Sequence, residues 1–197
     1  GYGSTARKCC SEWLYERIPA GDARKGWWSY EKLDQNGKVL EGYQQYKFRF
    51  ANPSNTYTGA DHIFMRIPEM YLTMAEAACR LGNDTEAQDI LNEFMEFRVS
   101  GDIPYDCSSK TGTALGALTT DETGSLLEEI ILQRRIELWG EGFAMADVMR
   151  LKKNVVRYHK GDENSNVPEP YRFNIQYGDP WMLLRFVQKE LTNNRGC

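Results

Sequence analysis

The chain has few residues that bind transition metals. It holds two histidines, His62 and His159, and its five cysteines form no C-x-x-C pair. Structural zinc sites are built from cysteine and histidine at short spacings, so we expect no metal site and assign no redox compartment. Cys79 falls in a helical apolar pattern, which indicates a small core residue.

Long hydrophobic runs and clusters of positive charge are also absent from the sequence. No apolar run approaches the ~20 residues that a helix needs to cross a bilayer. The net charge is −4, with both signs interspersed, which argues against nucleic-acid binding because that requires a positive stripe. With 197 residues, 41% of them hydrophobic, the chain can bury a core, and we expect a single domain over residues 1–197.

Signatures of common enzyme classes are missing as well. The sequence has no G-x-S-x-G, no phosphate-binding glycine loop and no H-E-x-x-H. Glu137 and Glu141 form a pair of carboxylates, but they lie beside Arg134 in an apolar pattern. Glycoside hydrolysis needs two carboxylates that face a cleft, so this setting indicates a structural role. We expect no catalytic residue and no cofactor.

The most informative stretch runs from Ser125 to Arg150. Wound as a helix, it has apolar stripes on nearly opposite sides, which predicts a helix packed between neighbours. Arg134, Glu137 and Glu141 fall within one stripe. Because unpaired ions are costly to bury, these charges predict an internal ion-pair network that ties this helix to others. A solvated edge of an amphipathic helix is the alternative.

The same central helix is expected to be interrupted. It should run to about Trp139, break around Gly140 and Gly142, and resume from Phe143 to Lys153. Residues 100–124 are rich in glycine, serine and threonine and predict a long loop.

A pair of helices is expected ahead of this loop. Pro68 is well placed to begin a helix and Gly82 to end it, and Asp84 or Thr85 can cap a second helix directly afterwards. The apolar faces expected are Ile67, Met70, Tyr71, Met74, Ala75, Ala78 and Leu81 in the first helix, and Ala87, Ile90, Leu91, Phe94 and Phe97 in the second. Two helices joined this tightly resemble one tetratricopeptide-type hairpin.

The predicted fold class is therefore mainly α. A tetratricopeptide-like hairpin and the central helix form a helical core at 66–153, between an irregular, aromatic-rich segment at 1–65 and an irregular tail at 154–197. The minor β content comprises a hairpin turn at Asn36-Gly37 and short strands at 43–50 and 171–177.

Several stretches match motifs of one known family in the same order. Residues 66–77, RIPEMYLTMAEA, look like its R-x-x-E-x-Y-L-x-x-A-E-A helix, and Asp22-Ala23-Arg24 looks like its D-x-R turn. Arg134 to Leu138, Glu141-Gly142, Asp147 and Arg150 look like its E-R-R-x-E-L-x-x-E-G-x-R-x-x-D-x-x-R block. The chain thus resembles the carboxyl-terminal part of the SusD/RagB family of outer-membrane nutrient-binding lipoproteins.

The chain departs from this family pattern at positions that usually carry charge. Gln133 replaces a Glu, Phe143 and Ala144 replace His-Arg, and Met95 stands where an Arg is common. These departures thin the family's charge network. The residues that we expect in the network here are Arg66, Glu76, Arg98, Arg134, Glu137, Glu141, Asp147 and Arg150.

The resemblance implies binding rather than catalysis. Members are lipid-anchored at the surface of Bacteroidetes cells and pass oligosaccharides or other nutrients to a TonB-dependent transporter. Because members are longer, the chain is expected to be a fragment without the anchor and without part of the ligand site. The alternative function is a helical-repeat scaffold that binds another protein through the groove of the 66–98 hairpin.

Sugar capture would use aromatic rings, on which the apolar faces of pyranoses rest, together with a few polar groups. The candidates for ligand contact are Trp27, Trp28, Tyr30, Arg24 and Tyr57. The alternative is that these aromatic residues pack the irregular segment beneath the helices. Trp139 and Trp181 are expected in the core.

Overall fold

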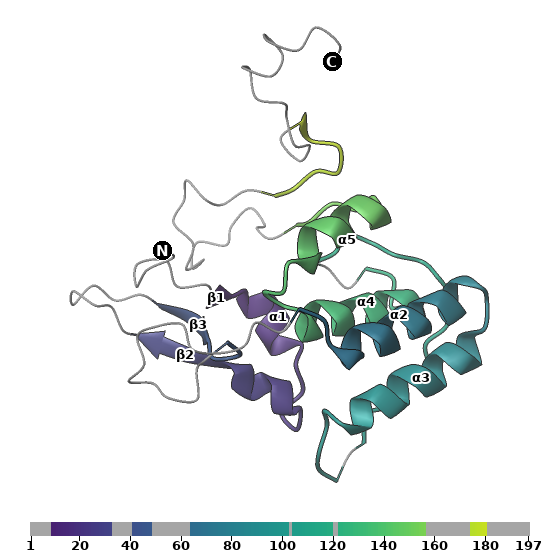
Figure 1. The fold of residues 1–197 in the computed structure, drawn as a ribbon, viewed down its shortest axis with the longest axis horizontal. Coiled ribbons are helices and arrows are strands. Elements are labelled where there is room, and N and C mark those ends of the chain that lie inside the picture. Colours follow the sequence, from purple (N-terminus) through teal and green to yellow (C-terminus); the bar gives the residue numbers. More distant parts are fainter. Residues whose placement is uncertain are drawn as a thin grey trace, which may run out of the picture.

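The computed structural model describes residues 9–32, 41–48, 64–102, 104–119, 122–156 and 174–180. Across these ranges the chain is mainly helical, which confirms the predicted fold class (Figure 1). The helices are α1 (Glu12–Glu16), the 3₁₀ helix η1 (Ala23–Trp27), α2 (Ile67–Arg80), α3 (Asp84–Glu96), α4 (Leu126–Glu137) and α5 (Phe143–Leu151). The strands are β1 (Cys9–Cys10), β2 (Trp28–Lys32) and β3 (Glu41–Gln45). No helix of the described part is long and apolar enough to cross a membrane.

The predicted hairpin is formed by α2 and α3. Pro68 lies in the first turn of α2, and Gly82 follows its end with a φ of +82°, a conformation that glycine adopts without strain. The cap of α3 was predicted one residue too late, because Asn83 occupies that position. The Asp84 carboxylate instead accepts a hydrogen bond from the Gly112 N–H at 2.9 Å. The hairpin is therefore tied to the loop at 104–119.

The apolar face predicted for α2 is only partly buried. This helix lies between α3 and α4 (Figure 1), and its buried side consists mainly of Leu72, Ala75, Ala78 and Cys79. The small side chains let the neighbouring helices approach closely. Residues predicted to be buried but found exposed are Ile67, Met70, Met74 and Leu81 on α2 and Phe97 after α3. The side of α2 that faces its neighbours carries Leu72 and the small residues, which leaves Ile67, Met70 and Met74 outside.

Helix α4 is buried on both sides, as its two apolar stripes predict. Ser125 caps it by accepting a hydrogen bond from the Glu128 N–H at 3.1 Å. Leu127 and Ile130 belong to the main hydrophobic cluster, which also includes residues of α2, α3 and α5. Ile136, near the other end, belongs to a second cluster with Cys10, Leu14, Ile18 and Trp28. Helix α4 therefore connects the helical core to the aromatic segment.

The break after α4 occurs where glycines predicted it. Gly140 and Gly142 have φ values of +78° and +93°. A Cβ atom on Gly140 would lie 2.6 Å from the ring of Phe48, so a side chain at this position would have to displace that ring. The helix ends at Glu137, two residues earlier than predicted.

The three strands form one antiparallel sheet in the order β1-β3-β2. Tyr30 on β2 is paired with Tyr43 on β3, and Trp28 with Gln45. Strand β3 begins two residues before the predicted strand and ends well short of Phe50. Three predictions lie outside the described residues: the turn at Asn36-Gly37, Tyr57 and Trp181. The strand predicted at 171–177 lies partly outside them, because the description resumes at Asn174.

Candidate functional site

A buried carboxylate at the end of α4 holds three arginines. Glu137 is fully buried. Its oxygens accept hydrogen bonds from Arg66 Nη1 at 2.7 Å and from Arg98 Nε at 3.0 Å, and Arg24 Nη1 lies 3.6 Å away. Burial acts to raise the pKa of Glu137, but the hydrogen bonds and charges of these arginines hold it below its usual value. Glu137 is therefore an ionised anchor for three elements at neutral pH.

Arg24 belongs to the same buried assembly. The Asp22 carboxylate accepts hydrogen bonds from the Arg24 backbone N–H at 2.8 Å and from its Nη2 at 2.6 Å. Nη2 also donates to Gln133 Oε1 and contacts the sulfur of Met95. The Arg24 side chain has 0% exposure. This burial contradicts the prediction of Arg24 as a ligand contact, because Nε and Nη2 are bound by the protein itself, and the buried Nη1, which has no hydrogen-bond partner among the described residues, faces Glu137.

A second group of charges joins α4 to α5 and α2. Arg134 Nε lies 3.0 Å from Asp147 Oδ2. Arg150 binds Asp147 at 2.8 Å and Glu76 at 2.6 and 2.8 Å. Arg134 pairs with Asp147 and not with Glu137 or Glu141 of its own stripe, because those two carboxylates bind other cations and α5 brings Asp147 to Arg134.

Glu141 connects the break after α4 to the end of β3. Its carboxylate accepts hydrogen bonds from Arg66 Nε at 3.0 Å and from Lys47 Nζ. Lys47 also donates to the carbonyl oxygens of Glu137 at 2.6 Å and Trp139 at 3.0 Å, which lie at the end of α4. Burial lowers the pKa of Lys47, an effect that the hydrogen bond to Glu141 opposes. Sequence reasoning missed Lys47 because nothing local marks it as buried.

The eight charged residues expected in a network thus lie in two linked groups between the helices. Their carboxylates are paired with cations, and the pKa of Glu76, like that of Glu137, lies below its ordinary value. A general acid needs a raised pKa near the working pH. The arrangement is suited to holding elements together, and poorly suited to proton transfer.

The predicted aromatic ligand contacts fall in three environments. Trp28 is 3% exposed and meets Trp139 edge to face at 5.6 Å, so burial contradicts its prediction as a ligand contact. Trp139 borders the second cluster, as expected. Trp27 is half-buried beneath Lys47, whose Nζ lies 4.8 Å from the ring centre. Tyr30 is 47% exposed.

Tyr30 belongs to a tyrosine cluster, which we define as Tyr15, Tyr30 and Tyr43. The rings of Tyr30 and Tyr43 meet at 5.4 Å across the β2–β3 pairing, and Tyr15 of α1 stacks on Tyr43 at 4.0 Å. Lys25 Nζ lies 4.8 Å from the Tyr15 ring. Burial raises the pKa of Tyr43, and the nearby carboxylates of Glu12 and Glu16 add to this effect. The cluster therefore combines aromatic surface with charged groups of both signs.

Sequence reasoning found Tyr30 but missed its two partners. A signal for Tyr43 was present, because Tyr30 and Tyr43 are each six residues from the Asn36-Gly37 turn. A two-residue turn at that place sets these residues opposite one another. Tyr15 has no such signal, since its contact depends on how α1 packs on the sheet.

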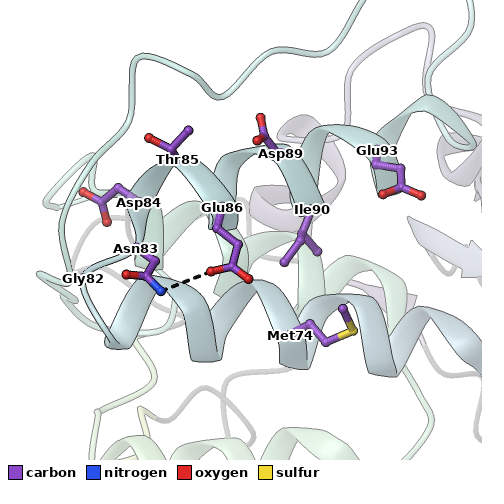
Figure 2. Close-up of a pocket in the computed structure, with 9 residues that line it drawn as sticks. All are labelled: Met74, Gly82, Asn83, Asp84, Thr85, Glu86, Asp89, Ile90 and Glu93. Carbon is purple, nitrogen blue, oxygen red and sulfur yellow. Dashed lines mark hydrogen bonds between the residues drawn. The ribbon is translucent and has the colours of Figure 1, made fainter.

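A separate open hollow of about 770 Å³ lies on the α2–α3 hairpin. Figure 2 shows Met74 of α2 facing Ile90 and Glu86 of α3 across it. The lining residues are Met74, Gly82, Asn83, Asp84, Thr85, Glu86, Asp89, Ile90 and Glu93. None of the nine is aromatic or basic, so the hollow lacks the flat rings that pyranoses stack on. Throughout the described ranges, no group of three or more metal-binding side chains is arranged to hold an ion.

Comparisons with known proteins agree on one family. A curated relative, SusD-like protein P38 of Formosa agariphila, is 29% identical over 126 residues, which cover 64% of this chain and 24% of the relative. A solved structure described as a SusD-like carbohydrate binding protein from Bacteroides vulgatus superposes with a TM-score of 0.68 at 26% identity. That match covers 95% of this chain and 40% of the solved one.

A second solved structure from Bacteroides vulgatus, described as a putative sugar binding protein, has a TM-score of 0.61 at 21% identity and supports the fold. It covers 93% of this chain and 37% of the solved chain. The chain therefore spans less than half the length of these relatives. The model of the SusD family matches residues 21–194, and the chain belongs to the SusD family.

Proposed function

We propose that the chain belongs to a non-catalytic protein that binds oligosaccharides, or other nutrients, at a bacterial outer surface and delivers them to a TonB-dependent transporter. The observation that supports this proposal is membership of the SusD family over residues 21–194. A family structure at 26% identity is described as a carbohydrate binding protein. Lipid anchoring at the outer membrane and the transporter partner follow from the family resemblance alone.

The tyrosine cluster and the half-buried ring of Trp27 are the proposed contacts for sugar. Tyr30 offers an exposed ring, and the flat C–H face of a pyranose can rest on such a ring. Glu12, Glu16 and Lys25 supply acceptors and a donor for hydroxyl groups beside the rings. Few polar groups next to aromatic surface are typical of small-ligand sites.

A non-catalytic role agrees with the state of the buried acids. The lowered pKa values of Glu76 and Glu137 keep both carboxylates ionised at neutral pH, whereas glycoside hydrolysis needs one protonated carboxylic acid. We expect no release of reducing sugar from any bound oligosaccharide.

The test is an array of neutral and acidic oligosaccharides, followed by calorimetry with the tightest binder. Tyr30→Ala should weaken binding about 5-fold, because a lost aromatic contact costs about 1 kcal/mol. Tyr177→Ala is the matched control, since Tyr177 is also exposed (45%) but lies far along the chain. Absence of saccharide binding by the full-length protein would refute the proposed function, and equal affinity of its Tyr30 variant would refute the proposed contact.

A further inference from the structure

Two exposed carboxylates border the tyrosine cluster. Glu12 and Glu16 are four residues apart on α1, so they project from the same side of this helix, with Tyr15 next to them on one flank and Trp13 on the other. Arg17 turns toward Trp13, because it donates to the Trp13 carbonyl oxygen at 3.0 Å and its guanidinium lies 3.7 Å from the Trp13 ring centre. The flank of α1 that carries Tyr15 therefore has carboxylates beside it and no arginine.

Both carboxylates remain available to a ligand. Across the described ranges, neither Glu12 nor Glu16 forms a salt bridge. They lie close enough to Tyr43 to raise the pKa of its hydroxyl group. The one cation in contact with the cluster is Lys25 among the described side chains, and its Nζ donates to the Ile18 carbonyl oxygen at 2.7 Å instead of to a carboxylate. Two carboxylates and one ammonium group leave one negative charge beside the rings.

The local structure explains only one of these charges. Glu12 lies in the first turn of α1, where the positive end of the helix dipole favours an acidic residue. Glu16 is the last residue of the helix, where a cation would be favoured instead. Glu16 therefore gains nothing from the helix that carries it, and the pair of carboxylates suits a positively charged group from outside.

We propose that the tyrosine cluster selects oligosaccharides that carry free, protonated amines, as in unacetylated hexosamine units. The sugar ring rests on Tyr30, and its ammonium group lies against the tyrosine rings beside Glu12 and Glu16. Aromatic rings attract ammonium groups through the negative charge of their faces, and the Tyr15 ring already has one, Lys25 Nζ, at 4.8 Å. The inference rests on the proposed sugar-binding function and adds the class of sugar to it.

The same charges discriminate against other classes of sugar. A uronate or a sulfated sugar would place a negative charge next to two carboxylates, and like charges in contact oppose binding. A hydroxyl or an acetamido group can donate a hydrogen bond to Glu12 or Glu16, but it lacks the positive charge that strengthens such a bond. We therefore expect amine-bearing sugars to bind most tightly, neutral sugars less tightly and acidic sugars least.

The test uses the full-length protein and oligosaccharides that share a backbone but differ in one substituent. An array carries α-linked and β-linked tetrasaccharides, each with a hydroxyl, an acetamido group or a free amine next to the anomeric carbon, together with uronates and sulfated sugars. Calorimetry on the backbone that binds should show that the amine form binds about 10-fold more tightly than the hydroxyl form. Raising the salt concentration from about 50 to 500 mM should weaken the amine form more than the hydroxyl form, because exposed charges are screened.

A double variant and its control locate the selectivity. Glu12→Gln combined with Glu16→Gln removes both charges and keeps the size of the side chains, so the preference for the amine form over the hydroxyl form should fall from about 10-fold to less than about 2-fold. Glu96→Gln on α3 should keep the full preference. Glu96 is the matched control because it is also exposed and, among the described residues, also forms no salt bridge. Thermal unfolding should show that all three substitutions leave the protein folded.

Several outcomes would overturn the inference. Equal binding of the amine and hydroxyl forms, or tighter binding of acidic sugars, would refute it and leave the proposed function intact. An unchanged preference in the double variant would place the amine away from Glu12 and Glu16. A tetralysine peptide that binds as tightly as the amine sugar would mean attraction of bulk charge only. Absence of binding to every sugar would instead refute the proposed function, and this inference with it.

Discussion

The two hydrophobic clusters of this protein differ in the types of residue that form them. The main cluster joins α2, α3, α4 and α5 through leucine, isoleucine and alanine side chains. The second cluster, around Trp28, is bordered by five aromatic residues, and apart from Ile136 of α4 its residues lie in or next to elements of five residues or fewer. The helical cluster is stabilised by packing between the apolar sides of long helices. The aromatic segment is attached to the helical body by Arg24 and Lys47.

The difference between the two clusters indicates why buried charges lie between them. The three-arginine site at Glu137 lies where the two regions meet, since Arg24 comes from η1 and Arg66 and Arg98 flank the hairpin. Short elements bury little apolar area and gain little from propensity. Directional ion pairs then set the position of such a segment on the helices.

Glu137→Gln should have the largest effect on stability. It leaves three arginines around a neutral amide, and breaking a buried ion pair costs about 3–5 kcal/mol. Urea unfolding measures the loss, with Glu96→Gln on the exposed side of α3 as the control. If both variants lose less than about 1 kcal/mol, the two regions are not joined by this carboxylate.

Trp28→Ala should cost about 3 kcal/mol or more, the range for a large buried aromatic side chain. If the aromatic segment depends on the helices and not the reverse, near-UV circular dichroism should change well before the far-UV helical signal. Leu91→Ala, in the fully buried part of the helical cluster, should instead lose both signals together. Coincident loss in both variants would show one undivided core.

Gly140→Ala should cost about 1–3 kcal/mol, because φ at this position is +78° and a Cβ atom would meet the Phe48 ring. Thermal unfolding checks the prediction, with Gly178→Ala as a comparator that shares a positive φ but has no atom within 4 Å of the added Cβ. If Gly140→Ala loses more stability than Gly178→Ala, the difference is the cost of the clash with Phe48, and the shared loss is the cost of the positive φ. Equal losses would mean that Phe48 is displaced easily.

Ser125→Ala should cost about 1 kcal/mol, the usual value of a helix N-cap. Its hydroxyl accepts from the Glu128 N–H and donates to the carbonyl oxygen of Ala114. The loss should appear as a small shift in the unfolding midpoint of the helical region alone. An effect on the aromatic segment as large as that of Trp28→Ala would contradict the separation of the two clusters.

The last prediction concerns how the stability of the unmodified chain changes with pH, which has little effect near neutral pH. The pKa of Glu76 and of Glu137 is lowered in the folded chain. Their contribution to stability is therefore complete above the unfolded value for Glu, about 4.3, and is lost as the pH falls through the lowered folded values. Urea unfolding between about pH 2 and 7 should show this loss, and Glu137→Gln should flatten the curve.

Sequence patterns predict the helical part well because its signals are local. Pro68 and Gly82 lie near the ends of α2, and the glycines at 140 and 142 lie in the break after α4. The charged residues of the network on the helices were also found, because charge inside an apolar stripe is a local feature, whereas Asp22, Arg24 and Lys47 were not predicted to belong to it. The partners of the helix residues were not found, since Arg134 meets Asp147 only through the direction that α5 takes after the break.

The site was harder to predict for the same physical reason. Hydrophobicity identifies the apolar residues of α2, but it does not tell which side a neighbour covers, so Met70 and Met74 were predicted as buried. Adjacent tryptophans also look alike in sequence, whereas η1 gives way to β2 between Trp27 and Trp28. Alternation along β2 then buries Trp28 and leaves the end of the same face, at Tyr30, exposed.

Glu137 also closes the hairpin. Arg66 precedes α2 and Arg98 follows α3, and both donate to this one carboxylate, while the turn at Gly82 joins the opposite ends of the two helices. Helix pairs ordinarily fray at the end without a turn. Here that end is held by ion pairs to one carboxylate, so the two helices are joined at both ends of the hairpin.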